Sequence, residues 1–251
     1  MIRWLLYNVL QMAPTRVRHA VERHHYGNLI RHFPIDQEKD LKAALQLVRQ
    51  GSVAIDVGAN VGLWTVNLAK AVGPAGRVLA FEPIPATFRI LEQIVEDVVG
   101  AQVSVLCECV AVSDRHGTAL MEVPRDGRRM PNHHLARLTS NGSGTEVPVS
   151  TLDSLLKDVR GRIGFIKIDT EGHELAVIKG ADTTLREHRP ILCIEVSTDL
   201  DDPATEGGEL FLRLSDLHYA CYLSGPQGLQ PRQDREASVN YFFMPQRAMD
   251  N

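Results

Sequence analysis

The chain has 251 residues, of which 44% are hydrophobic and 23% are charged. This composition is typical of a folded globular protein and excludes a largely disordered or fibrous chain. The formal net charge is −4 at pH 7, which gives no global attraction to nucleic acid, so we expect no nucleic-acid partner.

The first 40 residues differ from the rest because they are basic. Five arginines lie there with Glu22 as the only acid before Asp36, and four histidines lie among them. We predict an arm or lid over residues 1–40, helical in pieces, followed by one domain over 41–251. The arm is interpreted as a lid, a homodimer contact, a peripheral contact with an anionic membrane surface, or simply a solvated helical face.

The compartment is inferred from two simple features. The apolar run 4–10 is too short to span a bilayer, and no small-residue cleavage site follows it, so we predict neither a transmembrane segment nor a signal peptide. The four cysteines include no CxxC pair. A reduced, cytoplasmic protein is therefore expected.

From residue 39 onward, helical and strand patterns alternate. Helical spacing predicts a helix over 39–51 that ends at Gly51. Continuous apolar runs predict buried strands over 52–58, 77–83, 103–112, 163–169 and 191–196, with helices over 63–73, 86–98 and 174–188. A helix and strand over 209–223 and a last strand over 240–245 bring the total to about seven strands. Buried strands separated by helices indicate a mostly parallel sheet covered on both faces, so the predicted fold class is α/β, doubly wound.

One interval, 113–148, breaks this alternation. It is predicted to hold a short strand pair, 117–124 and 145–149, around the polar loop 125–144. The loop is either solvated or a lid over an acceptor, because loops of this length in compact domains are commonly functional. Its arginines suit phosphate or carboxylate groups; they are Arg125, Arg128, Arg129 and Arg137. Its histidine pair, His133 and His134, lacks the spacing of a metal site.

A glycine-rich turn, 55-IDVGANVGLWTVNLA-69, is the strongest local signal for a ligand site. A strand ends near Asp56, and Gly58 and Gly62 let the backbone turn tightly before a helix begins. GANVG is not the GxGxxG of dinucleotide-binding folds. The carboxylate of Asp56 would repel a phosphate and suit a cationic group.

The second strand ends in 81-FEP-83, which places Glu82 about one βαβ unit downstream of the turn. An acid at this place can accept hydrogen bonds from two ribose hydroxyls. An adenosyl ligand with a positive centre, S-adenosylmethionine (SAM), is therefore favoured. An NAD(P)-dependent oxidoreductase and a non-catalytic SAM-binding protein remain as alternatives.

Together, VAIDVGANVGLWT, FEP, AVSDRHGTA, VSTLDSLL, FIKIDTEGHELAVIKGA and NYFFMP resemble the FkbM family of SAM-dependent methyltransferases over roughly residues 50–245. The resemblance implies a seven-stranded, Rossmann-like class I methyltransferase domain over 41–251. It also implies O-methylation of a hydroxyl on a sugar, glycan, glycolipid or polyketide-type acceptor.

The same resemblance assigns cofactor contacts residue by residue. The methionine moiety of SAM is expected against Asp56, Gly58, Asn60 and Gly62, and its ribose against Glu82. The adenine is expected beside the end of the third strand, residues 109–112 with Val110 and Ala111, and Ser113 and Asp114 lie just beyond. Asp169, at the end of the fourth strand, is expected beside the sulfonium.

The stretch 165-FIKIDTEGHELAVIKG-180 supplies the candidate catalytic residues Asp169, Glu171 and His173. His173 is attractive as a base because its usual pKa lies near physiological pH, but it is equally read as an exposed first-turn residue. Glu171 can face the acceptor, and Glu174 is expected to be structural, because the helix dipole favours an acid in the first turn.

Carboxylates at the ends of neighbouring strands, Asp56, Asp169 and Glu195, should converge on one rim, so a compensating positive charge is expected. SAM itself, Lys167, or a magnesium ion on Asp169 and Glu195 could supply it. The metal is not favoured, because no third ligand is evident from the sequence.

Overall fold

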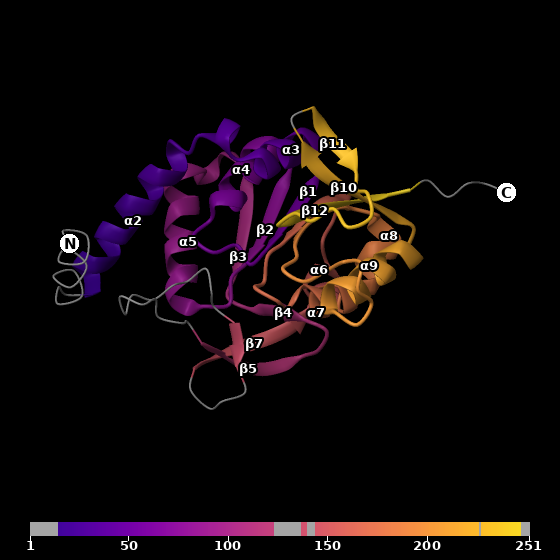
Figure 1. Ribbon diagram of the computed structural model, residues 1–251. Helices are drawn as coiled ribbons and strands as arrows, with labels where there is room; N and C mark the ends of the chain where they lie inside the picture. The colour runs from indigo at the N-terminus through magenta and orange to yellow at the C-terminus, as the bar shows by residue number, and fades with distance from the viewer. Residues whose placement is uncertain (1–14, 123–136, 140–143, 226, 247–251) are drawn as a thin grey trace, which may run out of the picture.

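The computed structural model describes residues 15–122, 137–139, 144–225 and 227–246 (Figure 1). The described chain forms a large and a small sheet. The eight strands of the large sheet are β1 (Val53–Val57), β2 (Arg77–Phe81), β3 (Ser104–Glu108), β8 (Ile163–Ile168), β9 (Ile191–Glu195), β10 (Tyr219–Gly225), β11 (Gly228–Pro231) and β12 (Asn240–Pro245). The small sheet consists of β4 (Ala111–Ser113), β5 (Gly117–Glu122), β6 (Arg137–Thr139) and β7 (Thr145–Thr151).

The helices surround the large sheet. They are α2 (Thr15–Arg31), α3 (Lys39–Leu47), α4 (Leu63–Val72), α5 (Pro85–Val98), α6 (Leu152–Leu156), α7 (Glu174–Lys179), α8 (Asp182–His188) and α9 (Glu206–Asp216), with short 3-10 helices η1 (Ile35–Gln37) and η2 (Gly100–Gln102). None of the helices in the described ranges is both long enough and apolar enough to cross a bilayer.

The strand order of the large sheet is β11-β10-β12-β9-β8-β1-β2-β3. The central strands are parallel, and β12 runs antiparallel to both β9 and β10. The order therefore reverses between β1 and β8, where ligands bind in doubly wound sheets. The prediction of a doubly wound, mostly parallel α/β fold is confirmed.

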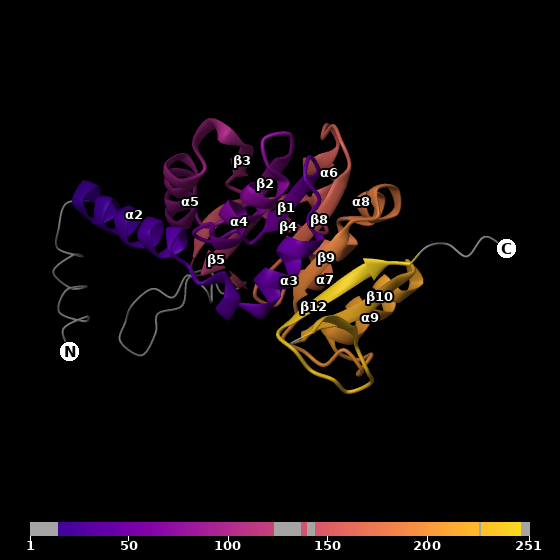
Figure 2. The same cartoon turned by 90° about the horizontal axis from the view of Figure 1, so that it is seen from above.

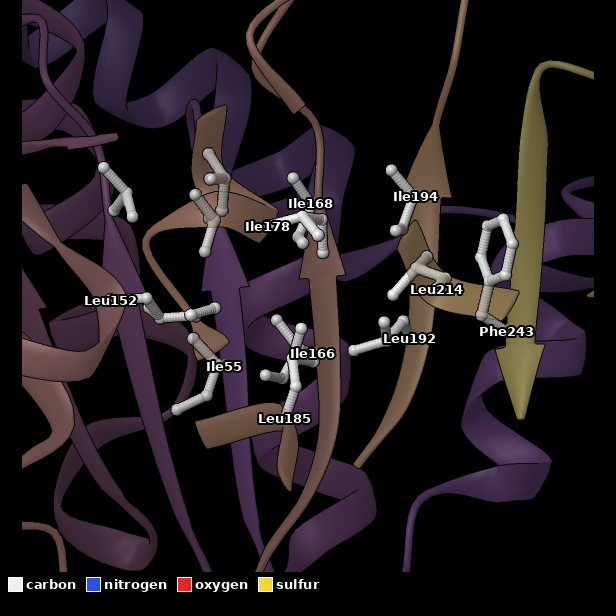
Figure 3. Packing of buried hydrophobic residues seen from close by; sticks show 14 of the residues in the cluster. Ile55, Leu152, Ile166, Ile168, Ile178, Leu185, Leu192, Ile194, Leu214 and Phe243 are labelled. Atoms are coloured by element: carbon white, nitrogen blue, oxygen red, sulfur yellow. The ribbon is translucent and has the colours of Figure 1, made fainter. Parts of the chain in front are cut away.

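Each face of the sheet has its own hydrophobic core. Helices α3, α4 and α5 cover one face and α6 to α9 cover the other (Figure 2). In β1, Ile55 points to the α6–α9 core and the adjacent Ala54 to the opposite core, as the strand's period of two requires. Figure 3 shows Ile55, Ile166 and Leu192 from three strands packed against helix residues such as Leu185.

The small sheet lies beside α7 at the lower edge of the molecule in Figure 1. The predicted strand pair 117–124 and 145–149 is confirmed, since β5 and β7 pair antiparallel. The predicted strand over 103–112 is wrong in one respect: β3 ends at Glu108, and residues 111–113 form β4, which pairs with β7 in the small sheet. Most of the predicted loop 125–144 lies outside the described residues.

Two helix predictions also need correction. The helix predicted over 174–188 is divided between α7 and α8 at Gly180 and Ala181. The helix predicted to end at Gly51 ends at Leu47, and Val48 is already extended with φ −71° and ψ 124°. Gly51 instead occupies a left-handed turn with φ 76°.

Part of the predicted basic arm is the continuous helix α2, which packs against α5 (Figure 1). Arg23 forms an ion pair with Asp97 of α5, and Arg31 donates to the Asp97 carbonyl oxygen over 3.0 Å. The next helix, α3, spans the predicted boundary at residue 40, and its buried Leu41 and Ala44 belong to the main domain.

Candidate active site

A cavity opens at the carboxyl ends of β1, β2 and β8, beside the place where the strand order reverses. It encloses about 670 Å³, including space open to solvent, which is within the range of ligand pockets. Its lining residues come from both sheets: Val57, Gly58, Asn60, Phe81, Glu82, Pro83, Val110, Ala111, Val112, Met121, Asp169, Thr170, Glu171 and His173.

The cavity gathers most of the residues predicted from the sequence. Gly58, Asn60, Glu82, Val110, Ala111, Asp169, Glu171 and His173 are among the lining residues. Met121 and Thr170 also line it, and no sequence pattern singled them out. Met121 reaches the cavity because β5 folds back through the small sheet, a long-range pairing that local periodicity does not report.

Gly58 brings the turn after β1 against the end of β8. The Asp169 amide donates to the Val57 carbonyl oxygen over 3.0 Å. Gly58 has φ 80°, and a Cβ atom built on it would lie 1.7 Å from the Asp169 carbonyl oxygen. Only glycine fits this approach, which lets backbone line the cavity floor.

Asp56 and Gly62 do not line the cavity. Asp56 is 1% exposed and accepts a hydrogen bond of 2.5 Å from the Thr65 hydroxyl of α4. Burial raises the pKa of Asp56 to about 6, although Thr65 and Lys167 oppose the rise. Gly62, with φ 95°, is the N-cap residue of α4, and a Cβ there would meet Leu91 of α5 at 2.8 Å. Both residues therefore support the turn on the side away from the cavity, through their contacts with Thr65 of α4 and Leu91 of α5.

Glu82 faces the cavity from the end of β2 and is 6% exposed. Its carboxylate accepts from the Asn60 amide over 3.0 Å and from the Ile84 amide over 2.9 Å. Burial raises its pKa to about 7, against the lowering effect of these amides. Because each carboxylate oxygen has two lone pairs, each keeps one for a ligand hydroxyl.

Lys167 supplies a buried positive charge beneath the acidic rim. Its ammonium group donates to Asn240 Oδ1 over 2.8 Å, lies 3.7 Å from Asp169 Oδ2 and stands 5.2 Å from the centre of the Trp64 ring. Burial opposes protonation, but the adjacent Cys193, followed by the carboxylates of Asp169 and Glu195, outweighs it, so the pKa of Lys167 is raised. The predicted compensating cation is therefore present in the chain.

Three carboxylates meet above Lys167. Oxygen atoms of Asp169, Glu171 and Glu195 lie within 4.8 Å of one another. Burial, followed by the charge of Asp169, raises the pKa of both Glu171 and Glu195, that of Glu171 to about 7. The sequence singled out Glu171 as a catalytic candidate but predicted Asp56 as the third acid beside Asp169 and Glu195, and in the structure Glu171 takes that place. We assign no ion to the cluster, because Lys167 already places a cation beside Asp169.

Glu174 organises the loop between β8 and α7. Its Oε1 accepts from the Thr170 amide and hydroxyl, both over 2.9 Å, and from the Gly172 amide over 3.1 Å. These bonds hold two successive residues in the left-handed region, Glu171 with φ 54° and Gly172 with φ 94°. Glu174 is 6% exposed and does not line the cavity, as expected for a structural residue.

His173 sits at the N-cap of α7 and makes no side-chain capping bond. Its Nε2 lies 2.9 Å from Ser113 Oγ, and that hydroxyl lies 3.1 Å from Asp114 Oδ1. Burial lowers the pKa of His173. The sequence placed Ser113 and Asp114 beyond the adenine but gave no sign that Ser113 contacts His173, sixty positions later.

The fold and the cavity define the class. Seven strands of the large sheet follow the order of the class I SAM-dependent methyltransferases, with an antiparallel strand next to the last, and β11 extends that edge. The sequence pattern described as the methyltransferase FkbM domain matches residues 56–221. The chain belongs to the FkbM methyltransferase family, and the resemblance seen in the sequence is confirmed.

Two curated relatives match part of the chain. Methyltransferase 1 from Beauveria bassiana (strain ARSEF 2860) is 29% identical over 154 residues, covering 52% of this chain and 59% of the relative. The 31-O-demethyl-FK506 methyltransferase FkbM from Streptomyces tacrolimicus is 29% identical over 164 residues, covering 54% and 61%. The matched regions thus span about three fifths of these relatives.

Solved structures with similar folds include further methyltransferases. Methyltransferase FkbM from Methylobacillus flagellatus aligns with a TM-score of 0.48 and 18% identity, over 81% of this chain and 50% of that one. A SAM-dependent O-methyltransferase from Thermotoga maritima aligns with a TM-score of 0.45 and 16% identity, over 87% and 68%.

Proposed function

We propose that this protein transfers a methyl group from SAM to a hydroxyl oxygen of a small-molecule or glycan acceptor. The observation that carries the proposal is the cavity at the strand-order reversal. The cavity combines a floor of backbone atoms at Gly58, an acid at Glu82 that can accept from ribose hydroxyls, and the acidic rim at Asp169. Family membership and the Streptomyces relative, whose name describes transfer to an oxygen, support the proposal.

The chemistry of the lining residues fits SAM. The remaining lone pairs of Glu82 suit two ribose hydroxyls, and Val110, Ala111 and Met121 offer an apolar wall for adenine. Gly58 and Asn60 would hold the methionine moiety, and Asp169 would lie near its positive groups. Asp56 and Gly62 would act on the methionine end through the turn that they shape.

The transfer needs the acceptor oxygen in line with the methyl group and a group that takes the hydroxyl proton. Holding two reactants in line can contribute roughly 7–11 kcal/mol to lowering the barrier. A general base contributes about 10²–10⁴ in rate. The candidates for the base are Asp169, Glu171 and His173, which all line the cavity.

A sugar, glycan, glycolipid or polyketide-type hydroxyl is the proposed acceptor. The arginine-rich segment that could contact an acidic acceptor lies mostly outside the described residues. A role of the arm as lid, dimer contact or anionic-surface contact also stays a prediction. The metal alternative is not favoured, and we expect EDTA to leave the transfer rate unchanged.

The experiment is transfer from methyl-labelled SAM to a panel of hydroxylated acceptors, with mass spectrometry of the product. Glu82→Gln should weaken SAM binding by roughly 10–100-fold, because it removes a charged hydrogen-bond acceptor. Glu108→Gln, a strand-end acid outside the cavity, is the matched control. Label transfer that is insensitive to Glu82→Gln would contradict the site, and absence of transfer together with NAD(P) binding would favour an oxidoreductase.

A further inference from the structure

We propose that Ser113 and Asp114 are positioning residues that set His173 as the proton acceptor of the reaction. This inference rests on the proposed function and selects one of its three candidate bases. It stands on a chain of contacts that crosses from the small sheet to α7: His173 Nε2 to Ser113 Oγ at 2.9 Å and Ser113 Oγ to Asp114 Oδ1 at 3.1 Å.

The direction of the hydrogen bonds follows from the hydrogens available. Ser113 has one hydroxyl hydrogen, and an ionised carboxylate such as that of Asp114 can only accept, so the hydroxyl donates to Asp114. The lone pair of the hydroxyl then faces His173 Nε2, which must carry the hydrogen and donate it. This leaves Nδ1 as the acceptor nitrogen of a neutral imidazole.

Nδ1 is available for an acceptor hydroxyl. His173 lines the cavity, and among the described residues no group is bonded to its Nδ1. Ser113, in contrast, is fully buried and does not line the cavity. The serine therefore acts behind the histidine, on the side away from the ligand.

The backbone fixes this arrangement. Gly180 closes α7 against β4 so tightly that a Cβ on it would lie 2.0 Å from the Ser113 carbonyl oxygen. At the other end of α7, its N-cap residue His173 accepts a hydrogen bond at its carbonyl oxygen from the Val177 amide over 3.2 Å. The packing of α7 against β4 thus holds the backbones of His173 and Ser113 at a separation that the two side chains bridge.

Charged groups on three segments act on the imidazole. Burial lowers the pKa of His173, so the neutral form that can accept a proton is favoured near pH 7. Asp114 and, more weakly, Glu174 and Glu206 of α9 favour the protonated form, while Arg115 opposes it. A proton taken at Nδ1 is therefore stabilised through Ser113 by the nearby carboxylate.

The proposed step balances as follows. When bound, SAM supplies the methyl group, and its sulfur keeps the electron pair of the broken bond. The acceptor oxygen forms the new carbon–oxygen bond, and its proton passes to His173 Nδ1. The imidazolium then keeps its Nε2 hydrogen bond to Ser113 and later releases the Nδ1 proton to solvent.

The first test reads the hydrogen-bond chain without ligand. Histidine labelled with ¹⁵N is observed by NMR across a pH titration, and His173→Gln assigns the signal among the 10 histidines. We expect an Nε2-bound proton protected from exchange, which Ser113→Ala removes. Asp114→Asn should lower the pKa of His173, because the carboxylate that favours protonation is gone.

The second test measures kcat, the KM values and their pH dependence. We expect Ser113→Ala to lower kcat by about tenfold or more with both KM values little changed. Asp114→Asn, whose exposed amide keeps a hydrogen-bond acceptor, should move the acidic limb of kcat to lower pH. Ser150→Ala is the matched control, because Ser150 Oγ contacts His116 Nδ1 over 3.3 Å outside the cavity.

The outcomes separate this inference from the proposed function. If SAM is bound and methyl transferred, but Ser113→Ala and Asp114→Asn leave the His173 signal and the pH profile unchanged, the positioning role is refuted. If wild-type protein neither binds SAM nor transfers methyl groups, the proposed function fails. Should Ser113→Ala not fold, Asp114→Asn decides alone, since that side chain is 42% exposed.

Discussion

Replacing Gly58 by alanine should disrupt the cavity more than its small size suggests. The new Cβ would lie 1.7 Å from the Asp169 carbonyl oxygen, whereas ordinary contacts begin near 3.4 Å. The ends of β1 and β8 would therefore have to separate. Left-handed backbone costs a residue with a Cβ about 1–2 kcal/mol, and overpacking adds about 1–3 kcal/mol.

Gly51→Ala separates these two costs. Gly51 has φ 76°, close to the 80° of Gly58, but a Cβ there would meet only the Ala75 Cβ at 3.9 Å. Urea denaturation should show a loss of about 1–2 kcal/mol for Gly51→Ala and of about 2–5 kcal/mol for Gly58→Ala.

Binding provides the second measurement on the same pair. Calorimetry with S-adenosylhomocysteine should show wild-type affinity for Gly51→Ala and a loss of about tenfold or more for Gly58→Ala, because the floor of the cavity has moved. Equal stabilities for the two variants, with wild-type affinity in Gly58→Ala, would refute the close approach of the two strand ends.

Three further predictions concern buried charges. In urea denaturation, Lys167→Met should lower the free energy of unfolding by about 3–5 kcal/mol, because it leaves the acidic rim without a compensating positive charge. The control Lys179→Met breaks the exposed ion pair to Glu209 and should cost under about 1 kcal/mol. The pKa of Asp56 is raised in the folded state to about 6, so its contribution to stability is lost as pH rises from about 4 to 6. The free energy of unfolding of Asp56→Asn should therefore exceed that of the wild type by roughly 3 kcal/mol at pH 7.5 and equal it below pH 4. Urea midpoints that are the same for variant and wild type at both pH values would refute this. Glu82 has a pKa of about 7, and hydrogen bonds from ribose hydroxyls favour its ionised form, so it should lose up to about one proton when SAM binds at pH 6 and none at pH 9. Calorimetry in buffers of different ionisation enthalpy should detect this release as a buffer-dependent heat. Glu82→Gln should abolish that heat.

The sequence reveals the features of this fold that are local. The apolar run before Asp56 and the glycines after it predict a strand, a tight turn and a helix, and this segment is built that way. Because parallel strands end at the same edge, the sequence predicts that Asp169 and Glu195 share one rim, and their oxygen atoms lie within 4.8 Å of each other. Asp56, predicted for the same rim, is instead buried beside Thr65.

What the sequence does not reveal depends on distant pairing. Residues 103–112 are mostly apolar on both sides of Glu108, so the pattern does not show that the chain leaves the large sheet after Glu108 and that residues 111–113 pair with β7. β11, with the sequence GLQP, has no apolar alternation and forms only because it folds back on β10.

The candidate site shows the same division. The sequence predicted Asp56 as a ligand contact. Its burial and its bond to Thr65 could not be foreseen, because they depend on how α4 packs. The contact between Ser113 and His173 joins β4 of the small sheet to the start of α7, which packs against β4 at Gly180. Neither interaction leaves a periodic or spaced pattern in the sequence.

Calorimetric titration of the purified chain with SAM, S-adenosylhomocysteine, NADH and NADPH tests whether the cavity is a SAM site. We expect one binding event for SAM and for its demethylated product, weakened by Glu82→Gln and unaffected by Glu108→Gln, with no heat from either nicotinamide cofactor. Binding of a nicotinamide cofactor without any response to SAM would contradict it.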